Sequence, residues 1–178
     1  NGPLDTTFGT GGIVTTNFSS IGTSIDKAYA VALQPDGKIV AAGYSDNGIM
    51  DVDFALARYN YDGSLDTGFG YGGMMRVTFL YANFGFDYGT SMAIQPDGKI
   101  VVAGYTSPSG EHPCIGLLRC NSDGSLDNTF GAFGTPGTVS TCLNGDAYAK
   151  SVAIQPDGKI VVAGYYSDST SILWIHQT

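Results

Sequence analysis

The sequence has little charge, and positive charge is the scarcer kind. Eight lysines and arginines stand against sixteen aspartates and glutamates, which gives a formal net charge of −8. Nucleic-acid binding needs clustered lysine and arginine, so this class of partner is not expected. No apolar run approaches the roughly eighteen residues of a membrane span, and no segment has the period of an amphipathic helix. We therefore expect an all-β chain with no membrane span.

Histidine is also scarce, which limits the catalytic and metal chemistry open to the chain. His112 and His176 stand in none of the local patterns of serine hydrolases, zinc proteases or Cys/His metal sites. A triad assembled from distant residues would leave no such pattern, so a hydrolase remains a third-ranked alternative. We expect no catalytic residues, no resident metal and no cofactor.

Only three cysteines are present. Cys114 and Cys120 lie six positions apart on one expected strand, which places them on the same face but about 20 Å apart, too far for a disulfide. Either one could pair with Cys142. The interpretation we favour is three ordinary thiols, because no repeat position holds a cysteine in all three copies.

In place of these features the chain has 26 glycines, 11 tyrosines and an internal repeat of about sixty residues. The motif Gln-Pro-Asp-Gly-Lys-Ile starts at residues 34, 95 and 155. Gly-Ser-Leu-Asp starts at residues 63 and 124, with Gly-Pro-Leu-Asp at residue 2 as its first copy. Such a period indicates supersecondary units that bury their apolar faces against neighbours. We interpret the chain as one structural unit that contains three repeats, at approximately residues 1–61, 62–122 and 123–178.

Each repeat is expected to fold into four antiparallel strands, which in the first copy cover residues 29–34, 38–44, 53–59 and 74–79. Between the first two strands, Pro-Asp-Gly forms a tight turn whose positive-φ position falls on Gly37, Gly98 or Gly158. The near-continuous apolar run at residues 100–104 is typical of a strand covered on both faces. Four such strands describe one blade of a β-propeller.

The repeat resembles the bacterial delta-60 repeat in three motifs: Ala-Ile-Gln-Pro-Asp-Gly-Lys-Ile-Val-Val-Ala-Gly, Leu-Ala-Arg-Tyr-Asn and Asp-Gly-Ser-Leu-Asp-Thr-x-Phe-Gly. The resemblance covers the whole chain. It implies a β-propeller with NHL-like blades, in which the Asp-Gly hairpin joins the two innermost strands. It also implies an extracellular or cell-surface place in bacteria and no established catalytic residues. The third copy departs from the pattern, with Trp174 and His176 at the positions of Leu56 and Arg58.

In the NHL-like order, the chain begins with an outer strand near residues 13–18 and stops after three inner strands. Three blades cannot close a ring, since propellers have about four to eight. We expect Ile13 and Val14 to pair with the strand of Ile172 and Trp174 in another copy, because open strand edges favour pairing. A ring of two chains is favoured over a fragment of a longer propeller and over an open fibre.

The turn clusters are weak candidates for calcium binding. Oxygen ligands are available from Asp62, Asp66, Asp123 and Asp127. The turns lack the spacing of the EF-hand loop, and turn chemistry alone explains their Asn, Asp, Gly and Ser. The recurrent arginines of the third strand are expected to pair with an aspartate of their own or the adjacent blade.

Aromatic residues provide the other candidate site. Residues 79–88 hold five aromatics, among them Tyr81, Phe84, Phe86 and Tyr88. In an exposed loop such rings would suit sugar stacking or protein contacts, but the interpretation we favour is that they pack over a blade edge or between subunits. The expected function is therefore a non-enzymatic, self-assembling interaction protein. A carbohydrate- or protein-binding propeller that uses variable aromatic loops is the alternative.

Overall fold

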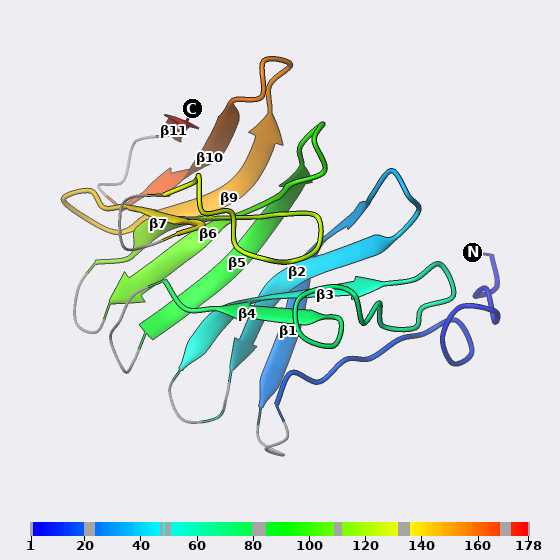
Figure 1. The fold of residues 1–178 in the computed structure, drawn as a ribbon. Coiled ribbons are helices and arrows are strands. Elements are labelled where there is room, and N and C mark those ends of the chain that lie inside the picture. The colour runs from blue at the N-terminus through cyan, green and yellow to red at the C-terminus, as the bar shows by residue number, and fades with distance from the viewer. Residues whose placement is uncertain are drawn as a thin grey trace.

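The computed structural model of the chain describes residues 2–19, 24–46, 48, 51–79, 85–108, 112–131, 136–167 and 172–177. Regular structure within these residues is β-strand, and eleven strands follow one another along the chain (Figure 1). They are β1 (Ile25–Leu33), β2 (Ile39–Asp46), β3 (Val52–Tyr59), β4 (Met74–Val77), β5 (Gly85–Ile94), β6 (Ile100–Pro108), β7 (Cys114–Cys120), β8 (Thr138–Thr141), β9 (Ala147–Ile154), β10 (Ile160–Tyr166) and β11 (Ile172–Gln177). Across the described ranges, no helix has the length and apolar character needed to cross a membrane.

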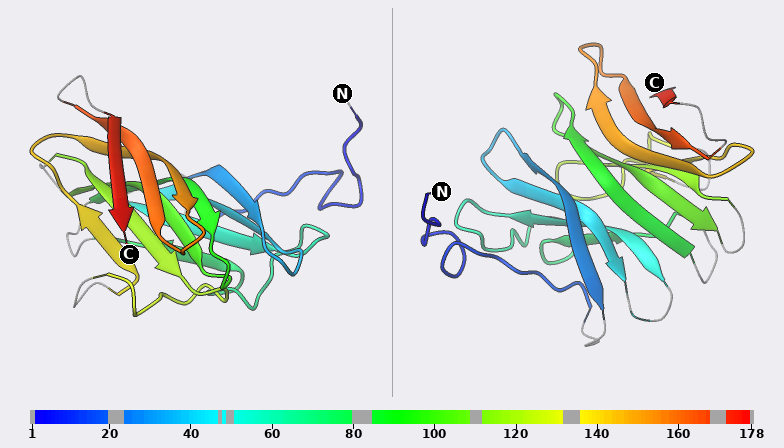
Figure 2. Two further views of the ribbon diagram at one scale, coloured as in Figure 1. Left: turned by 90° about the horizontal axis from the view of Figure 1, so that it is seen from above. Right: turned by 180° about the vertical axis from the view of Figure 1, so that it is seen from behind.

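The strands form three blades in which successive strands are antiparallel neighbours. The first blade contains β1 to β4, the second β5 to β8, and the third β9 to β11. A single parallel bridge from Val52 to Phe86 joins β3 to β5. The blades stand side by side in an open array, with the N-terminal segment at one end and β11 at the other (Figures 1 and 2). The fold is therefore all-β and built of propeller blades, as predicted, and the described array is not closed.

Each Pro-Asp-Gly hairpin has the geometry expected from its sequence. Gly37, Gly98 and Gly158 each have φ of 85°, a left-handed conformation that glycine adopts without strain. In the first hairpin, the amide of Gly37 donates to the carbonyl of Gln34 at 2.9 Å, and that of Gln34 to Lys38 at 2.8 Å. These turns fix the register between the two innermost strands of every blade.

The two core clusters lie between blades. Between the first and second blades, Val40, Phe54 and Leu56 pack with Ile100, Val102 and Leu118, all fully buried. Between the second and third, Val101, Ile115 and Leu117 pack with Ala149, Ile160 and Val162. Alternate residues of β6 thus enter different clusters. The apolar run at residues 100–104 has this composition because the second blade is covered on both faces.

The favoured interpretation of three ordinary thiols is wrong, and the alternative that Cys142 pairs with another cysteine is confirmed, because Cys114 and Cys142 form a disulfide. In the β7–β8 pair, Ile115 lies opposite Thr141, so the next pair outward in the antiparallel register is 114 with 142. Their Cα atoms are 4.4 Å apart. Sequence spacing alone could not reveal this contact, since it depends on how β8 pairs with β7. Cys120 is the free cysteine and is buried.

Two strand boundaries also differ from the prediction. β1 and β5 begin four or more residues early, at Ile25 and Gly85, so residues 85–88 belong to a strand and not to a loop. The expected outer strand near residues 13–18 has no ladder partner among the described residues and is not assigned as a strand.

Candidate functional site

One side of the first blade faces away from the other blades, and we call it the free face. Register places on this side the residues Val31, Leu33, Ile39, Ala41 and Ala57. The N-terminal segment, residues 5–18, crosses it (Figure 2). The Thr16 hydroxyl lies 2.7 Å from the Tyr59 hydroxyl, and Val14, Thr16 and Phe18 share the lining of one pocket with Ala41 and Ala57. The segment is therefore docked on the blade and not a detached tail.

The first anchor of the N-terminal segment repeats a contact found between two complete blades. The amide of Gly9 donates to the carbonyl of Asp62 at 2.7 Å. One repeat later, the amide of Gly70 donates to the carbonyl of Asp123 at 2.8 Å, which ties the turn before β4 to the second blade. Gly9 thus binds the first blade in the same way as Gly70, in the outer part of the first blade, binds the second blade.

A second anchor, at the other end of the segment, repeats in the same way. The amide of Phe18 donates to Oδ2 of Asp26 at 3.1 Å, and the amide of Phe79 donates to Oδ2 of Asp87 at 2.8 Å. Phe79 closely follows β4, the outer strand of the first blade, and Asp87 lies on β5, the innermost strand of the second. Residues 8–18 are therefore anchored on the first blade at both ends, as residues 69–79, which include the outer strand β4, are anchored on the second.

The turn at residues 8–13 also matches the turn at residues 69–74, one repeat later. Gly12 donates to Phe8 at 2.9 Å and Thr10 to Ile13 at 2.9 Å, and the corresponding bonds one repeat later measure 2.9 and 2.8 Å. The difference lies in strand pairing. β4 pairs with β3, whereas residues 13–16 pair with no strand in the described part of the chain. The side chain of Ile13 is accordingly 57% exposed.

The free face is apolar and open beside the N-terminal segment. Val31 is 71% exposed and Leu33 is 70% exposed. Their counterparts in the second blade, Met92 and Ile94, pack against the core cluster formed with the first blade. The free face therefore carries residues of the kind that a neighbouring blade covers.

A pocket of about 260 Å³ lies between the N-terminal segment and the free face, with Gly43 in its lining. In the second blade, the equivalent glycine is Gly104. A Cβ atom placed there would lie 2.8 Å from Cζ of Phe54, so the Phe54 ring from the preceding blade fills this position. The pocket corresponds to the space that a side chain of a preceding blade would enter.

The opposite end of the array is also open. β11 is the edge strand of the third blade in the described residues. Val161 on β10 is half-buried, while its counterparts Val40 and Val101 are fully buried. The ring of Tyr165 is 47% exposed at the same end. Both ends thus present surfaces that are interior elsewhere in the array.

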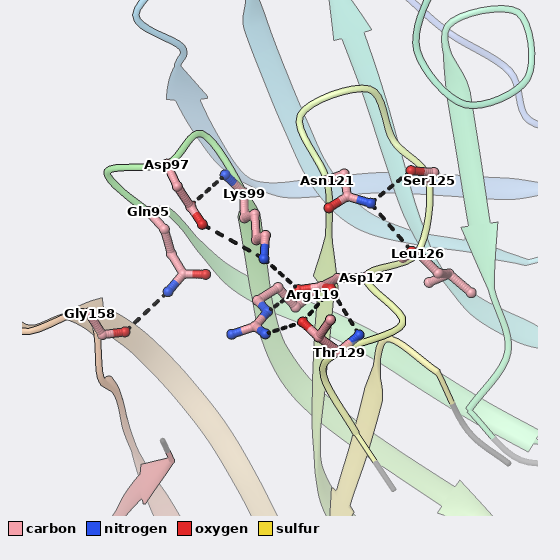
Figure 3. Close-up of polar contacts among 10 residues, drawn as sticks. All are labelled: Gln95, Asp97, Lys99, Arg119, Asn121, Ser125, Leu126, Asp127, Thr129 and Gly158. Carbon is pink, nitrogen blue, oxygen red and sulfur yellow. Dashed lines mark hydrogen bonds and ion pairs between the residues drawn. The ribbon is translucent and has the colours of Figure 1, made fainter. Parts of the chain in front are cut away.

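Each recurrent arginine binds an aspartate that follows it in the same blade, and Figure 3 shows the pair of the second blade. Nε of Arg119 lies 2.7 Å from Oδ2 of Asp127, and Nζ of Lys99 lies 3.0 Å from the same oxygen. Burial opposes ionisation of Asp127, but hydrogen bonds from Thr129, Lys99 and Arg119 outweigh it and hold the Asp127 pKa well below its ordinary value. We call this arrangement the ion cluster.

The first blade holds the same ion cluster, with Arg58 and Lys38 at 2.7 and 2.6 Å from Oδ2 of Asp66. Nη1 of Arg58 also donates to the carbonyl of Ser122 in the second blade. Among the calcium candidates, Asp66 and Asp127 are thus neutralised by cationic side chains. Asp62 and Asp123 accept hydrogen bonds from the serines two residues later, which turn formation explains.

A row of six tyrosines crosses all three blades. Tyr44, Tyr88, Tyr105, Tyr148 and Tyr165 follow one another with ring centroids 4.7 to 4.9 Å apart, and Tyr29 lies 6.0 Å from Tyr44. The rings alternate between stacked and edge-on contacts, so the inner ones cover one another. Burial raises the pKa of Tyr105 to about 12. Inter-blade packing uses these rings, which does not favour the sugar-binding alternative.

The predicted aromatic loop is only partly described. Tyr81 and Phe84 lie outside the described residues. Phe79 is buried against Phe54, with ring centroids 4.6 Å apart, and Tyr88 belongs to the tyrosine row. Phe86 on β5 is 41% exposed. The described rings of this stretch therefore pack within the array or lie on a strand, and they form no continuous binding surface.

The structure describes the surroundings of one histidine, His112. Nδ1 of His112 lies 2.5 Å from Oδ1 of Asp146 in an exposed pair at the surface. No hydroxyl or thiol among the described side chains is hydrogen-bonded to this ring. His176 lies on β11, whose side chains are outside the description. In the described ranges, no three His, Cys, Asp or Glu side chains gather in a way that could hold a metal ion.

These blades, with their repeated hairpins, ion clusters and inter-blade cores, define a β-propeller repeat protein. A family model for a β-propeller domain of unknown function, DUF5122, matches residues 34–69, 95–130 and 155–172. The chain belongs to this family, and each matched segment begins at one copy of the Gln-Pro-Asp-Gly-Lys-Ile motif. A search of curated proteins finds no match to the chain.

Proposed function

We propose that the chain is a non-enzymatic, self-assembling interaction protein whose open ends are completed by a second copy. The observation that carries this proposal is the docking of residues 8–18 on the free face. This segment has both anchors of an outer strand but no inner strands beside it in the described part of the chain. The third blade of another copy supplies three strands of the same repeat, with a free edge on β11.

The register of β11 within its own blade supports a specific pairing. Trp174 lies opposite Ala163 as Leu56 lies opposite Ala42, so β11 holds the place of β3 in its blade. In the first blade the amide of Arg58 donates to the carbonyl of Gly73 at 2.9 Å. The matching bond in the assembly runs from the amide of residue 176 in one copy to Gly12 of the other. Residues 13–16 then pair with β11 as β4 pairs with β3.

The number of blades is compatible with closure of a ring. Two copies joined at both ends make six blades, which lies within the usual range of about four to eight. Each junction covers a free face and removes an open strand edge, both of which are costly to leave in water. The partner most compatible with the free face is another blade of this repeat, since Met92 and Ile94 show how such a blade covers the equivalent positions.

The proposal includes an extracellular or cell-surface location in bacteria and the narrower assignment to the delta-60 repeat. The Cys114–Cys142 disulfide supports the location, because such bonds persist in oxidising compartments. The repeat motifs support the assignment.

The test is the solution mass of the 178-residue chain by light scattering over a range of concentrations. We expect twice the mass of one chain. The variant Leu33→Glu should dissociate it, because residue 33 is exposed in one chain and covered at the junction. Tyr71→Glu is the matched control: Tyr71 is 91% exposed on a blade that is already flanked by its successor, so the assembly should persist.

A stable monomer at all concentrations would contradict the proposal. Further repeats of a longer polypeptide would then be the candidates to cover the free face. A ladder of larger species would favour the open fibre over the two-chain ring. An assembly that tolerates Leu33→Glu as well as Tyr71→Glu would place the interface elsewhere on the molecule.

A further inference from the structure

The ion cluster is complete in the first two blades but only begun in the third. Lys99 contacts two carboxylates, that of Asp97 in its hairpin at 3.8 Å and that of Asp127 at 3.0 Å (Figure 3). Lys159, its counterpart in the third blade, contacts the hairpin carboxylate of Asp157 at 2.6 Å. No described residue supplies the carboxylate that corresponds to Asp127.

The carboxylate in the corresponding repeat position is Asp5, at the opposite end of the array. Gly2-Pro3-Leu4-Asp5 is the first copy of the motif that ends in Asp66 and Asp127. The carbonyl of Asp5 accepts from the amide of Phe8 at 3.1 Å, as that of Asp127 accepts from Phe130 at 3.0 Å. The backbone around Asp5 therefore has the shape that the ion cluster uses.

The side chain of Asp5 is also oriented as in a complete cluster. Its Oδ1 accepts from the amide and hydroxyl of Thr7 at 3.0 and 2.6 Å. Oδ1 of Asp127 accepts from Thr129 at 3.0 and 2.7 Å, which leaves Oδ2 for Arg119 and Lys99. The Thr7 hydroxyl lowers the pKa of Asp5, so this carboxyl is ionised at neutral pH. In the described residues no cation contacts Oδ2 of Asp5.

We infer that Oδ2 of Asp5 in one copy accepts from Nζ of Lys159 in the other and supplies the carboxylate of the ion cluster in that copy's third blade, where His176 stands at the arginine position. This inference rests on the proposed closure by a second copy. It adds a specific charged contact to the apolar free face and to the backbone pairing of residues 13–16 with β11. Because the complete clusters are largely buried, a like charge at either position should strongly oppose closure.

The experiment is a charge exchange between copies. Asp5→Lys alone places a second cation beside Lys159 at both junctions of a ring, and Lys159→Glu alone puts two acids together. Each variant should assemble at least about tenfold more weakly than the native chain. Mixed in equal amounts, the two variants can form a ring with one native junction and one exchanged junction. The mixture should recover assembly to within about threefold of the native chain, because neither junction then brings like charges together.

Asp97→Lys is the control for Asp5→Lys, since it changes the net charge by the same amount but lies on an exposed hairpin of the middle blade. It should assemble as the native chain does. Native-like assembly by either variant alone, or failure of the mixture to recover assembly, would overturn the inference. In that case a dimer of the native chain would still support the proposed function. A native chain that remains monomeric would overturn both. Matching circular dichroism spectra for all variants would show that each one folds.

Discussion

At the scale of single residues, glycine serves two different purposes in each blade. Gly98 has the positive φ of its hairpin turn, and this role can be predicted from Pro-Asp-Gly. Gly104 lies within β6, where a Cβ atom would be 1.8 Å from the carbonyl oxygen of Tyr88. The register of β5 against β6 shifts at this point, so the two backbones approach too closely for any side chain. The second role cannot be predicted without the paired strand.

Asp87 is a buried carboxyl whose protonation should make stability depend on pH. It is 1% exposed, and burial raises its pKa from 3.8 to about 6, against the lowering effect of the Phe79 amide. The folded chain then binds this proton more tightly than the unfolded chain does. The resulting contribution to stability is present at low pH and is lost as pH rises from about 4 to about 6.

Replacement of this carboxyl by an amide should remove the effect. In Asp87→Asn, the amide oxygen can still accept from Phe79, and the site no longer carries charge. Relative to the native chain, the free energy of unfolding of the variant should rise between about pH 4 and pH 7 by roughly 3 kcal/mol, the worth of a shift of about two units. Urea unfolding at intervals across this range measures the difference. Parallel curves for the two proteins would contradict a raised pKa.

At the scale of elements, alternation and turn motifs predict most strands, but contacts between distant strands need the structure. The pattern locates β2, β3 and β4 within one or two residues. It places residues 85–88 in a loop because their pairing with β6 depends on the length of that partner strand. The pattern misses the disulfide for a related reason. Cys142 becomes the neighbour of Cys114 only through the register of β8 on β7.

The disulfide should make a large contribution to the stability of the second blade. It closes a loop of 28 residues, so chain entropy predicts a stabilisation of roughly 3.6 kcal/mol. The double variant Cys114→Ser/Cys142→Ser should lose about this amount in denaturant unfolding. Thiol titration checks the pairing directly: the native chain should react with no equivalents, and the unfolded chain with one. Burial raises the pKa of Cys120 to about 12, which keeps its thiol unreactive until unfolding. Three reactive thiols after unfolding would contradict the bond.

At the scale of the whole molecule, the repeat predicts the blades, and the structure adds how a blade holds its neighbour. The anchor at Gly9 joins two backbone groups, whereas the anchor at Phe18 joins a backbone amide to the side-chain carboxylate of Asp26. The tyrosine row draws on two different strands per blade, and Lys27 takes the place of Tyr88 and Tyr148 in the first. A motif search therefore detects only part of the row.

Joining two copies in one polypeptide should produce a closed molecule. In the repeat register, Thr178 corresponds to Asn60 and Asn1 to Asp62, so a single linking residue restores the turn that normally follows β3. One junction then becomes covalent, and the other forms within the same chain. Light scattering should give the mass of one tandem chain. Its unfolding temperature should not depend on concentration, whereas that of the single chain should rise with concentration because its assembly is bimolecular.

The matched control carries Leu33→Glu in the first half of the tandem only, which blocks the non-covalent junction and leaves the covalent one unchanged. Small-angle scattering should then show a larger radius of gyration than the unmodified tandem has, because six blades with one junction blocked form an open arc. The same substitution in the second half falls at the covalent junction, where the tether keeps the facing blades together, so a smaller effect is expected. An unmodified tandem that continues to associate into larger species would show that six blades do not close, and that the rotation between neighbouring blades leads to a fibre.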